Sequence, residues 1–126
     1  METLIVNDNF EEISEILMDL SDDKGCDVVI TAGGTGMSSK DNTPEATKSI
    51  IDKEVPGFSE AMRMETFKIT KRSIFSRGVT GIRGKTLIIN LPASASGVSE
   101  CLEVVRDVIP VALDLINENV NKCSDN

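Results

Sequence analysis

The sequence predicts an α/β fold with a mostly parallel sheet, and three observations favour it. Residues 28–30 and 87–89 are short apolar runs with the length of buried strands. Around these runs, apolar residues recur at the three- and four-residue spacing of amphipathic helices. A β-prone run, a helix and a buried strand also follow one another at the start of the chain, and such a βαβ unit joins parallel strands.

The N-terminal part of the chain supplies this predicted βαβ unit. Residues 3–6 are the β-prone run, and Asp8 or Asn9 can cap the helix that follows. Residues 10–20 repeat apolar side chains at helical spacing, and residues 27–31 form an apolar run of the kind that a parallel sheet buries on both faces. We therefore expect the first two strands to lie in one sheet.

Two helices are predicted in the middle of the chain. Thr43 is an N-cap residue and Pro44 suits the first helical position, so a helix should begin there and end near residues 56–57. A second helix is expected over residues 58–67. Residues 69–77 are ambiguous, because they match neither a helical nor a strand pattern clearly.

The last third of the chain predicts a β-hairpin followed by a helix. Residues 79–82 and 86–90 have strand character, and a tight turn can form between them across residues 83–84. Apolar residues from 98 to 105 share one helical stripe, and Pro110 should kink or restart that helix.

Size and composition predict one domain over residues 1–120 and a frayed tail over residues 121–126. A chain of 126 residues suits one compact domain better than two. No apolar run approaches the ~20 residues of a membrane span, and no signal-peptide pattern opens the chain. The three cysteines lack the spacing of a zinc site, and free thiols are typical of a reducing compartment. We therefore predict a cytoplasmic protein with no membrane partner.

The charge distribution argues against nucleic acid as a partner and favours a small anion. The net charge is −8, whereas nonspecific nucleic-acid binding needs a basic surface. One segment of this acidic chain nevertheless sets a single acid, Glu65, against seven basic residues, which are Arg63, Lys68, Lys71, Arg72, Arg77, Arg83 and Lys85. Such a segment can focus a small anionic ligand, and a solvated face explains its charges equally well.

The absence of histidine limits the possible chemistry. A histidine general base, a histidine-activated nucleophile and a histidine-ligated metal are all excluded for this sequence. A bound metal must therefore be a hard cation held by oxygen atoms, such as Mg²⁺.

Two aspartates are the candidate catalytic and metal-binding residues. Asp8 follows the first predicted strand, and Asp41 lies in the loop after the second. In open α/β sheets, ligands bind beyond the carboxyl ends of parallel strands, so both acids reach one crevice if these strands are neighbours. Paired carboxylates there suit a Mg²⁺ ion that carries a nucleotide phosphate. Two structural alternatives stay open, namely Asp8 as a helix cap and Asp41 as a turn former before Thr43.

A glycine-rich loop precedes Asp41 in the sequence. Gly33, Gly34 and Gly36 allow backbone N–H groups to approach an anion closely. Alone this loop is a weak signal, because it matches neither the P-loop nor the dinucleotide-binding fingerprint. An ordinary turn from a strand to a helix explains it as well.

The combination of these motifs is more specific than any one of them. Over roughly residues 4–117 the chain resembles the molybdopterin-binding, Mog-like family of molybdenum-cofactor biosynthesis proteins. The matching segments are Thr31-Ala32-Gly33-Gly34-Thr35-Gly36, Asp41, Thr43-Pro44-Glu45-Ala46, Pro56-Gly57-Phe58, Glu60, Met62-Arg63, Ser76-Arg77, Gly84-Lys85-Thr86 and Asn90-Leu91-Pro92.

This resemblance implies a three-layer α/β/α sandwich that forms a homo-oligomer, a trimer or a hexamer. It implies binding of molybdopterin and, in the adenylyltransferase branch, transfer of AMP from Mg-ATP to the terminal phosphate of molybdopterin. Carried over by position, Asp8 and Asp41 match the two essential acids. The cofactor-binding positions match Gly33, Gly34, Thr35, Gly36, Ser76, Asn90 and Pro92. We add Arg77 as a phosphate ligand, because arginine presents a planar fork of donors.

Two departures from the family pattern keep other functions open. Family members usually begin one βα unit earlier, so we expect this chain to lack the first unit. Ala93 also stands where relatives typically have glycine, and it meets a cost if that position needs a positive φ. The alternatives are a binding module that holds molybdopterin or its precursor without adenylating it, and a truncated, inactive paralogue.

Overall fold

The computed structural model describes residues 1–118, which form the predicted α/β fold; the predicted tail over residues 121–126 lies outside them. Within the described residues, the sheet has four strands in the order β1-β4-β3-β2, with β1 Val28–Ala32, β2 Lys53–Glu54, β3 Thr80–Arg83 and β4 Thr86–Leu91. β1 and β4 are parallel, whereas β4 with β3 and β3 with β2 are antiparallel. This part of the chain therefore has a mixed sheet, not the mostly parallel one expected.

The first predicted strand is absent from the sheet. Residues 3–6 form no strand, and Ile5 is fully exposed. β propensity alone does not make a strand, because a strand is stabilised by pairing with and packing against its neighbours. The βαβ unit predicted at the start of the chain is therefore wrong. The parallel connection runs instead from β1 to β4, through the middle of the chain.

Helices account for much of the remaining chain. They are α1 Phe10–Met18, the π-helical turn η1 Asp19–Asp23, α2 Thr43–Ile50, α3 Pro56–Phe67, the 3₁₀ helix η2 Lys71–Phe75, α4 Ala95–Val105 and α5 Ile109–Ile116. A proline lies in the first turn of α2, α3 and α5, where its missing N–H costs no helical hydrogen bond. Pro110 thus starts a new helix, as predicted. No helix within residues 1–118 is long and apolar enough to cross a membrane.

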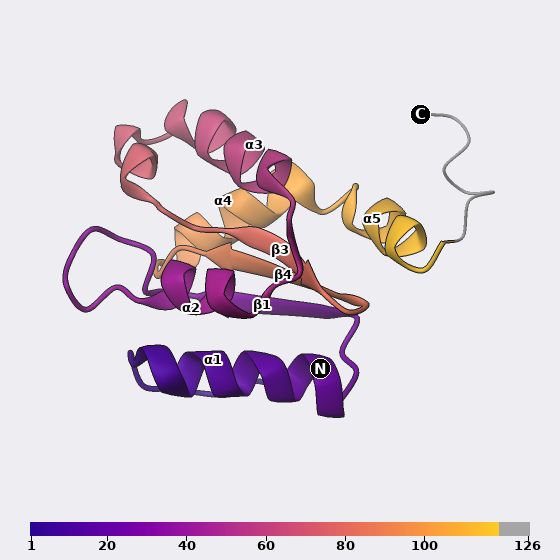
Figure 1. Ribbon diagram of the computed structural model, residues 1–126. Helices are drawn as coiled ribbons and strands as arrows, with labels where there is room; N and C mark the ends of the chain where they lie inside the picture. The colour runs from indigo at the N-terminus through magenta and orange to yellow at the C-terminus, as the bar shows by residue number, and fades with distance from the viewer. Residues whose placement is uncertain (119–126) are drawn as a thin grey trace.

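The molecule has three layers because alternate residues of β4 face opposite sides of the sheet (Figure 1). Ile88 packs with Ile13 and Leu17 of α1 and with α2 on one face. Leu87 and Ile89 pack with α3 and α4 on the other face. Each face thus buries its own hydrophobic cluster, and the three-layer arrangement is confirmed.

β3 and β4 form the predicted hairpin, with its turn at residues 84–85, one residue later than expected. Gly84 has a φ of 58° there, a conformation that glycine adopts without strain.

The parallel pair of strands places two loops side by side. Ala32 and Leu91 are register partners at the carboxyl ends of β1 and β4. The amide of Gly33 donates to the Leu91 carbonyl at 2.9 Å, so loop 33–36 leaves the sheet beside loop 92–94. Ligands of open α/β sheets bind at this end of the strands.

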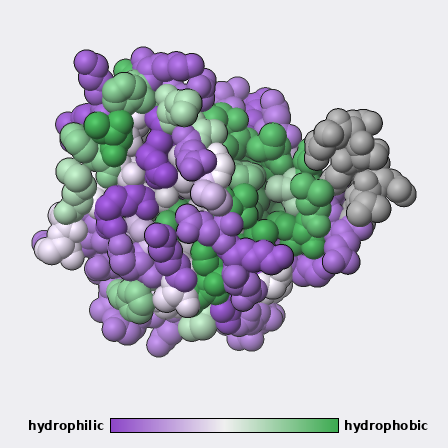
Figure 2. Space-filling view, turned by 45° about the horizontal axis from the view of Figure 1, so that its top comes forward, coloured by the Kyte–Doolittle hydropathy of each residue, from purple (hydrophilic) through white to green (hydrophobic). Residues whose placement is uncertain are grey.

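The described residues leave one side of α5 uncovered. Ile109, Ala112 and Ile116 pack on the core, whereas Val108, Val111 and Leu115 are 49%, 37% and 51% exposed. Figure 2 shows hydrophobic residues gathered on the side of the molecule where α5 lies. The helix is therefore apolar on two faces but covered on one.

Candidate functional site

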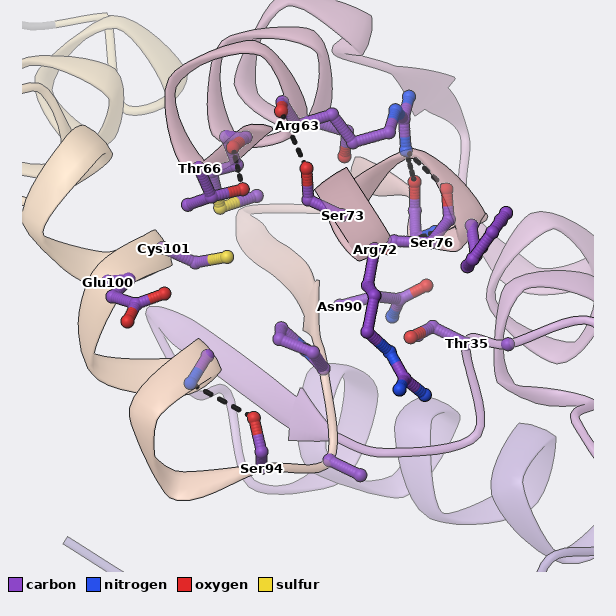
Figure 3. Close-up of a pocket in the computed structure, with 18 of the residues that line it drawn as sticks. Thr35, Arg63, Thr66, Arg72, Ser73, Ser76, Asn90, Ser94, Glu100 and Cys101 are labelled. Carbon is purple, nitrogen blue, oxygen red and sulfur yellow. Dashed lines mark hydrogen bonds between the residues drawn. The ribbon is translucent and has the colours of Figure 1, made fainter. Parts of the chain in front are cut away.

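A cavity of about 350 Å³ opens at the carboxyl ends of β1 and β4. Its walls come from the glycine-rich loop 33–36, α3, η2, the loop after β4 and the first half of α4 (Figure 3). These elements are far apart in the sequence and meet only because β1 and β4 are neighbours. The cavity lies where the sequence places the ligand site.

The glycine-rich loop contributes Gly34, Thr35 and Gly36 to the lining of this cavity. Gly33 and Gly34 have positive φ angles of 103° and 69°. A Cβ atom at Gly34 would collide with Oγ1 of Thr43 and lie 3.1 Å from Oδ1 of Asp8. Within residues 1–118, the amides of Gly34 and Thr35 donate to no other group, although both residues line the cavity. Two unpaired donors in a tight loop suit a bound anion.

Asp41 stands against this loop and lines the cavity. Its Oδ2 accepts hydrogen bonds from the Ser38 amide (2.9 Å) and the Ser38 hydroxyl (2.8 Å). These two bonds lower the pKa of the Asp41 carboxyl below its usual value, and the bond from the Ser38 hydroxyl has the larger effect. A Cβ atom at Gly36 would lie 2.9 Å from the same oxygen, so a larger residue there would displace the carboxylate. Asp41 is therefore a loop-forming residue and, at neutral pH, a negative charge on the cavity wall.

Asp8 lies beside Gly34 of the same loop. The helix cap is its neighbour Asn9, whose side chain accepts from the Glu12 amide at 3.1 Å, so the cap alternative for Asp8 is wrong. Asp8 is exposed and is not among the residues that line the cavity. Asp8 thus lies beside Gly34 of the loop, and Asp41 lies beside Gly36. Within residues 1–118, no group of three or more His, Cys, Asp or Glu side chains could form a metal site by itself.

Arg77 joins the glycine-rich loop to α2 by hydrogen bonds and an ion pair. Its Nε donates to the Gly36 carbonyl (2.7 Å), and its Nη2 donates to the Asp41 carbonyl (2.9 Å). Both Nη atoms also contact the carboxylate of Glu45 in α2, at 2.5 Å and 3.3 Å. This pairing lowers the pKa of Glu45 and raises the pKa of Arg77. Arg77 does not line the cavity, and its donors are committed to the protein, so the structure favours a positioning role for it.

Three other predicted positions, Ser76, Asn90 and Pro92, do line the cavity. The amide group of Asn90 is buried and occupied: its nitrogen donates to the hydroxyls of Thr31 and Thr47, both at 3.0 Å, and its oxygen accepts from the Val79 amide. Asn90 therefore holds the cavity wall together.

Ala93 also lines the cavity, beside the glycine-rich loop. Its φ is not positive: Glu118 is the one non-glycine residue with a positive φ in the described chain. The cost expected at Ala93 is therefore absent, because its backbone conformation is open to any residue.

The cavity also contains residues that were not among the predicted site residues. Arg72 of η2, Arg63 of α3 and Cys101 of α4 belong to its lining. Burial raises the pKa of the Cys101 thiol, so this side chain is neutral and contributes apolar surface. The basic segment 63–85 includes both arginines, and the family-like segment Met62-Arg63 includes Arg63 as well.

Residues 1–111 match the family described as "Probable molybdopterin binding domain". The molybdopterin adenylyltransferase of Helicobacter pylori strain J99 is 47% identical over 115 residues, which cover 91% of this chain and 65% of the relative. The molybdopterin adenylyltransferase of Escherichia coli K12 is 40% identical over 107 residues, which cover 85% of this chain and 55% of the relative. This chain therefore spans less than two thirds of the length of these two relatives.

A solved structure gives the same result for the fold. The crystal structure of the molybdopterin biosynthesis enzyme MoaB from Thermus thermophilus superposes with a TM-score of 0.82 at 46% sequence identity, covering 86% of this chain and 69% of that one. The family match, the relatives and the fold agree with the motifs that surround the cavity. The chain belongs to the molybdopterin-binding domain family.

Proposed function

We propose that this chain takes part in molybdenum-cofactor biosynthesis by binding molybdopterin and transferring AMP from Mg-ATP to its terminal phosphate. One observation carries the proposal: the unpaired amides of Gly34 and Thr35 and the carboxylate of Asp41 meet at one wall of a cavity of about 350 Å³. A volume of this order suits a small molecule with several polar groups. The named activity of the two adenylyltransferase relatives supports the same reaction.

The transfer needs two phosphates held in one place. A phosphate oxygen of molybdopterin bonds to the α-phosphorus of ATP, and the bond from that phosphorus to the bridging oxygen breaks, which releases pyrophosphate. The free amides of Gly34 and Thr35 can hold phosphate oxygens, since backbone N–H groups in a tight loop bind anions. Arg77 supports this arrangement by fixing the carbonyls of Gly36 and Asp41.

The donor groups fit a magnesium ion that arrives with the nucleotide. Mg²⁺ is typically bound by one or two carboxylates together with substrate phosphates, so it needs no cage of protein ligands. Asp8 and Asp41 lie beside Gly34 and Gly36 of the glycine loop, respectively. These two residues would hold the ion, which supplies neutralisation of phosphate charge.

A second candidate function is molybdopterin binding without adenylyl transfer. Its support is the position of Asp8, which is exposed and outside the cavity lining. Binding of molybdopterin without release of pyrophosphate from ATP would favour this candidate. We also propose a cytoplasmic location and a homotrimer or hexamer, which rest on the family resemblance.

The test of the proposed function is Asp41→Asn, assayed by ATP-dependent formation of adenylated molybdopterin. We expect AMP transfer to fall by on the order of a hundredfold, because the change removes a carboxylate that would hold the magnesium ion at the phosphates, a contribution of several kcal/mol. Ser38→Ala is the matched control, since it removes a loop hydrogen bond to Asp41 but keeps the carboxylate. Unchanged transfer in Asp41→Asn would refute the proposed role. An equal loss in Ser38→Ala would mean that Asp41 acts by shaping the loop.

A further inference from the structure

Arg72 is a cavity residue whose side chain is not used to hold the fold together. It lies in η2, and its backbone amide donates to the Thr70 hydroxyl at 3.3 Å, which caps this short helix. Figure 3 shows its side chain turned from η2 into the cavity, with the guanidinium group toward Thr35 and Asn90. The contact between the Ser73 hydroxyl and the Arg63 carbonyl (3.2 Å) ties η2 to α3, so the backbone that carries Arg72 is anchored.

The guanidinium of Arg72 is unoccupied, unlike those of its two neighbours. Within residues 1–118 it makes no hydrogen bond and no ion pair. Arg77 is bound to Glu45 and to two carbonyls, and Nη1 of Arg63 donates to the carbonyls of Ser76 and Gly78. Arg72 is therefore the arginine whose full set of donors is available to a ligand in the cavity.

The charges around the cavity indicate which ligand group Arg72 can take. Asp41 and Glu100 are the carboxylates of the lining, and neither forms an ion pair with Arg72. The guanidinium of Arg72 points toward Thr35. The amides of Thr35 and of its neighbour Gly34 are unpaired within residues 1–118. A cation and two amide donors around one space suit an anion with several oxygen atoms, and arginine binds phosphate through two parallel N–H donors.

We propose that Arg72 binds a phosphate group of the ligand and thereby selects phosphorylated over unphosphorylated molecules. The inference rests on the proposed function, which supplies two sources of such a group, the terminal phosphate of the pterin and the phosphates of the nucleotide. Arg72 acts as a binding residue, so its contribution is measurable without any turnover.

The test compares the binding of ligands with and without phosphate to the unaltered chain and to one variant. Arg72→Gln and the unaltered chain are titrated by calorimetry with 6-hydroxymethylpterin, with its monophosphate and with Mg-ATP. We expect Arg72→Gln to weaken binding of a phosphorylated ligand about tenfold, the effect of a charge-assisted hydrogen bond, and to leave the unphosphorylated pterin within about twofold. A loss confined to the pterin phosphate assigns Arg72 to the pterin, and a loss confined to Mg-ATP assigns it to the nucleotide.

Two further variants separate charge from position. Lys71→Gln removes the adjacent cation, which does not line the cavity, and should change none of the affinities. Arg72→Lys keeps the charge without the planar fork and should recover part of the loss. Equal affinities of Arg72→Gln and the unaltered chain for both phosphorylated ligands would overturn the inference, as would the absence of phosphate-dependent binding in the unaltered chain. Because Asp41→Asn tests transfer and Arg72→Gln tests binding, failure of the proposed function is distinguishable from failure of this inference.

Discussion

Single residues in the glycine-rich loop combine a backbone requirement with a spatial one. Gly34 has a positive φ, and the space that a Cβ atom would occupy is already filled by Thr43 and approached by Asp8. Gly25 has a similar φ of 60°, but nothing lies within 4 Å of the corresponding position. A substitution at Gly25 therefore meets only backbone strain, whereas a substitution at Gly34 meets backbone strain and a collision.

We expect Gly34→Ala to destabilise the chain more than Gly25→Ala does. Both changes meet the cost of a left-handed backbone, about 1–2 kcal/mol. Gly34→Ala adds an overpacking cost of about 1–3 kcal/mol, because Thr43 and Asp8 must move. Urea unfolding followed by circular dichroism measures both, since the chain lacks the Trp and Tyr that fluorescence needs. Equal losses in the two variants would contradict the crowding at Gly34.

The pair of Arg77 and Glu45 predicts a pH-dependent contribution to stability. The hydrogen bond from Arg77 lowers the pKa of Glu45 in the folded chain, so the contribution is complete above the ordinary glutamate pKa and is lost as the pH falls through the lowered value. Both side chains are partly exposed, at 38% and 50%, so we expect Glu45→Gln to cost only about 0.5–1 kcal/mol at neutral pH. The difference from the unaltered chain should vanish in acid. Urea unfolding at several pH values measures it, with the exposed Glu60→Gln as the control.

Elements are tied together by a few buried polar groups. Asn90 of β4 joins Thr31 of β1, Thr47 of α2 and the amide of Val79, which precedes β3. These four positions belong to different elements, so one side chain sets the spacing of the sheet and of one helix against it. Within residues 1–118, no buried side-chain nitrogen or oxygen atom lacks a partner.

Removal of the Asn90 side chain is expected to loosen this junction. Asn90→Ala leaves a buried amide and two hydroxyls without their partner, and each unpaired group costs about 1–3 kcal/mol, so we expect a total loss of at least about 3 kcal/mol. Asn117→Ala is the control, because its amide also donates to a carbonyl, that of Leu113, but at an exposed helix end. A similar effect of the two changes on the free energy of unfolding would mean that the junction contributes little.

At the scale of the whole molecule, the described residues leave the edges of the sheet and one face of α5 open. Within the described residues β1 pairs only with β4, and Ile30 in its centre is 45% exposed. An uncovered edge strand with apolar side chains favours pairing with another chain. Together with the exposed side of α5 seen in Figure 2, this surface favours self-association.

We expect light scattering at micromolar concentration to give a mass above that of the 13.6 kDa chain. Ile30→Lys should lower the fraction of the associated form, because a charge on an edge strand opposes pairing. Ile74→Lys changes an isoleucine that is 59% exposed and lies outside the sheet, so it should have no such effect. A monomer that is stable at every concentration would contradict the expectation.

The sequence alone determined the features that depend on neighbouring residues. The apolar runs of β1 and β4, the hairpin between β3 and β4, and the starts of α2 and α5 follow from local patterns and were predicted. The predicted end of the first middle helix near residues 56–57 is wrong, because α2 ends at Ile50, β2 follows, and Pro56 begins α3. The glycine-rich loop with its flanking motifs was sufficient to identify the family. These features are local because propensity, turn chemistry and capping act over a few residues.

Only the tertiary structure decided which groups are left for a ligand. Arg77 has the charge of a phosphate ligand, but its partners lie 32 to 41 residues away and occupy its donors. Arg72 lies in a segment of ambiguous pattern, and its donors stay unpaired because no carboxylate or carbonyl of residues 1–118 reaches it. Residues 3–6 have β propensity but no partner strand. In each case a donor or a strand is used only if the fold brings a partner to it, and that partner is distant in the chain.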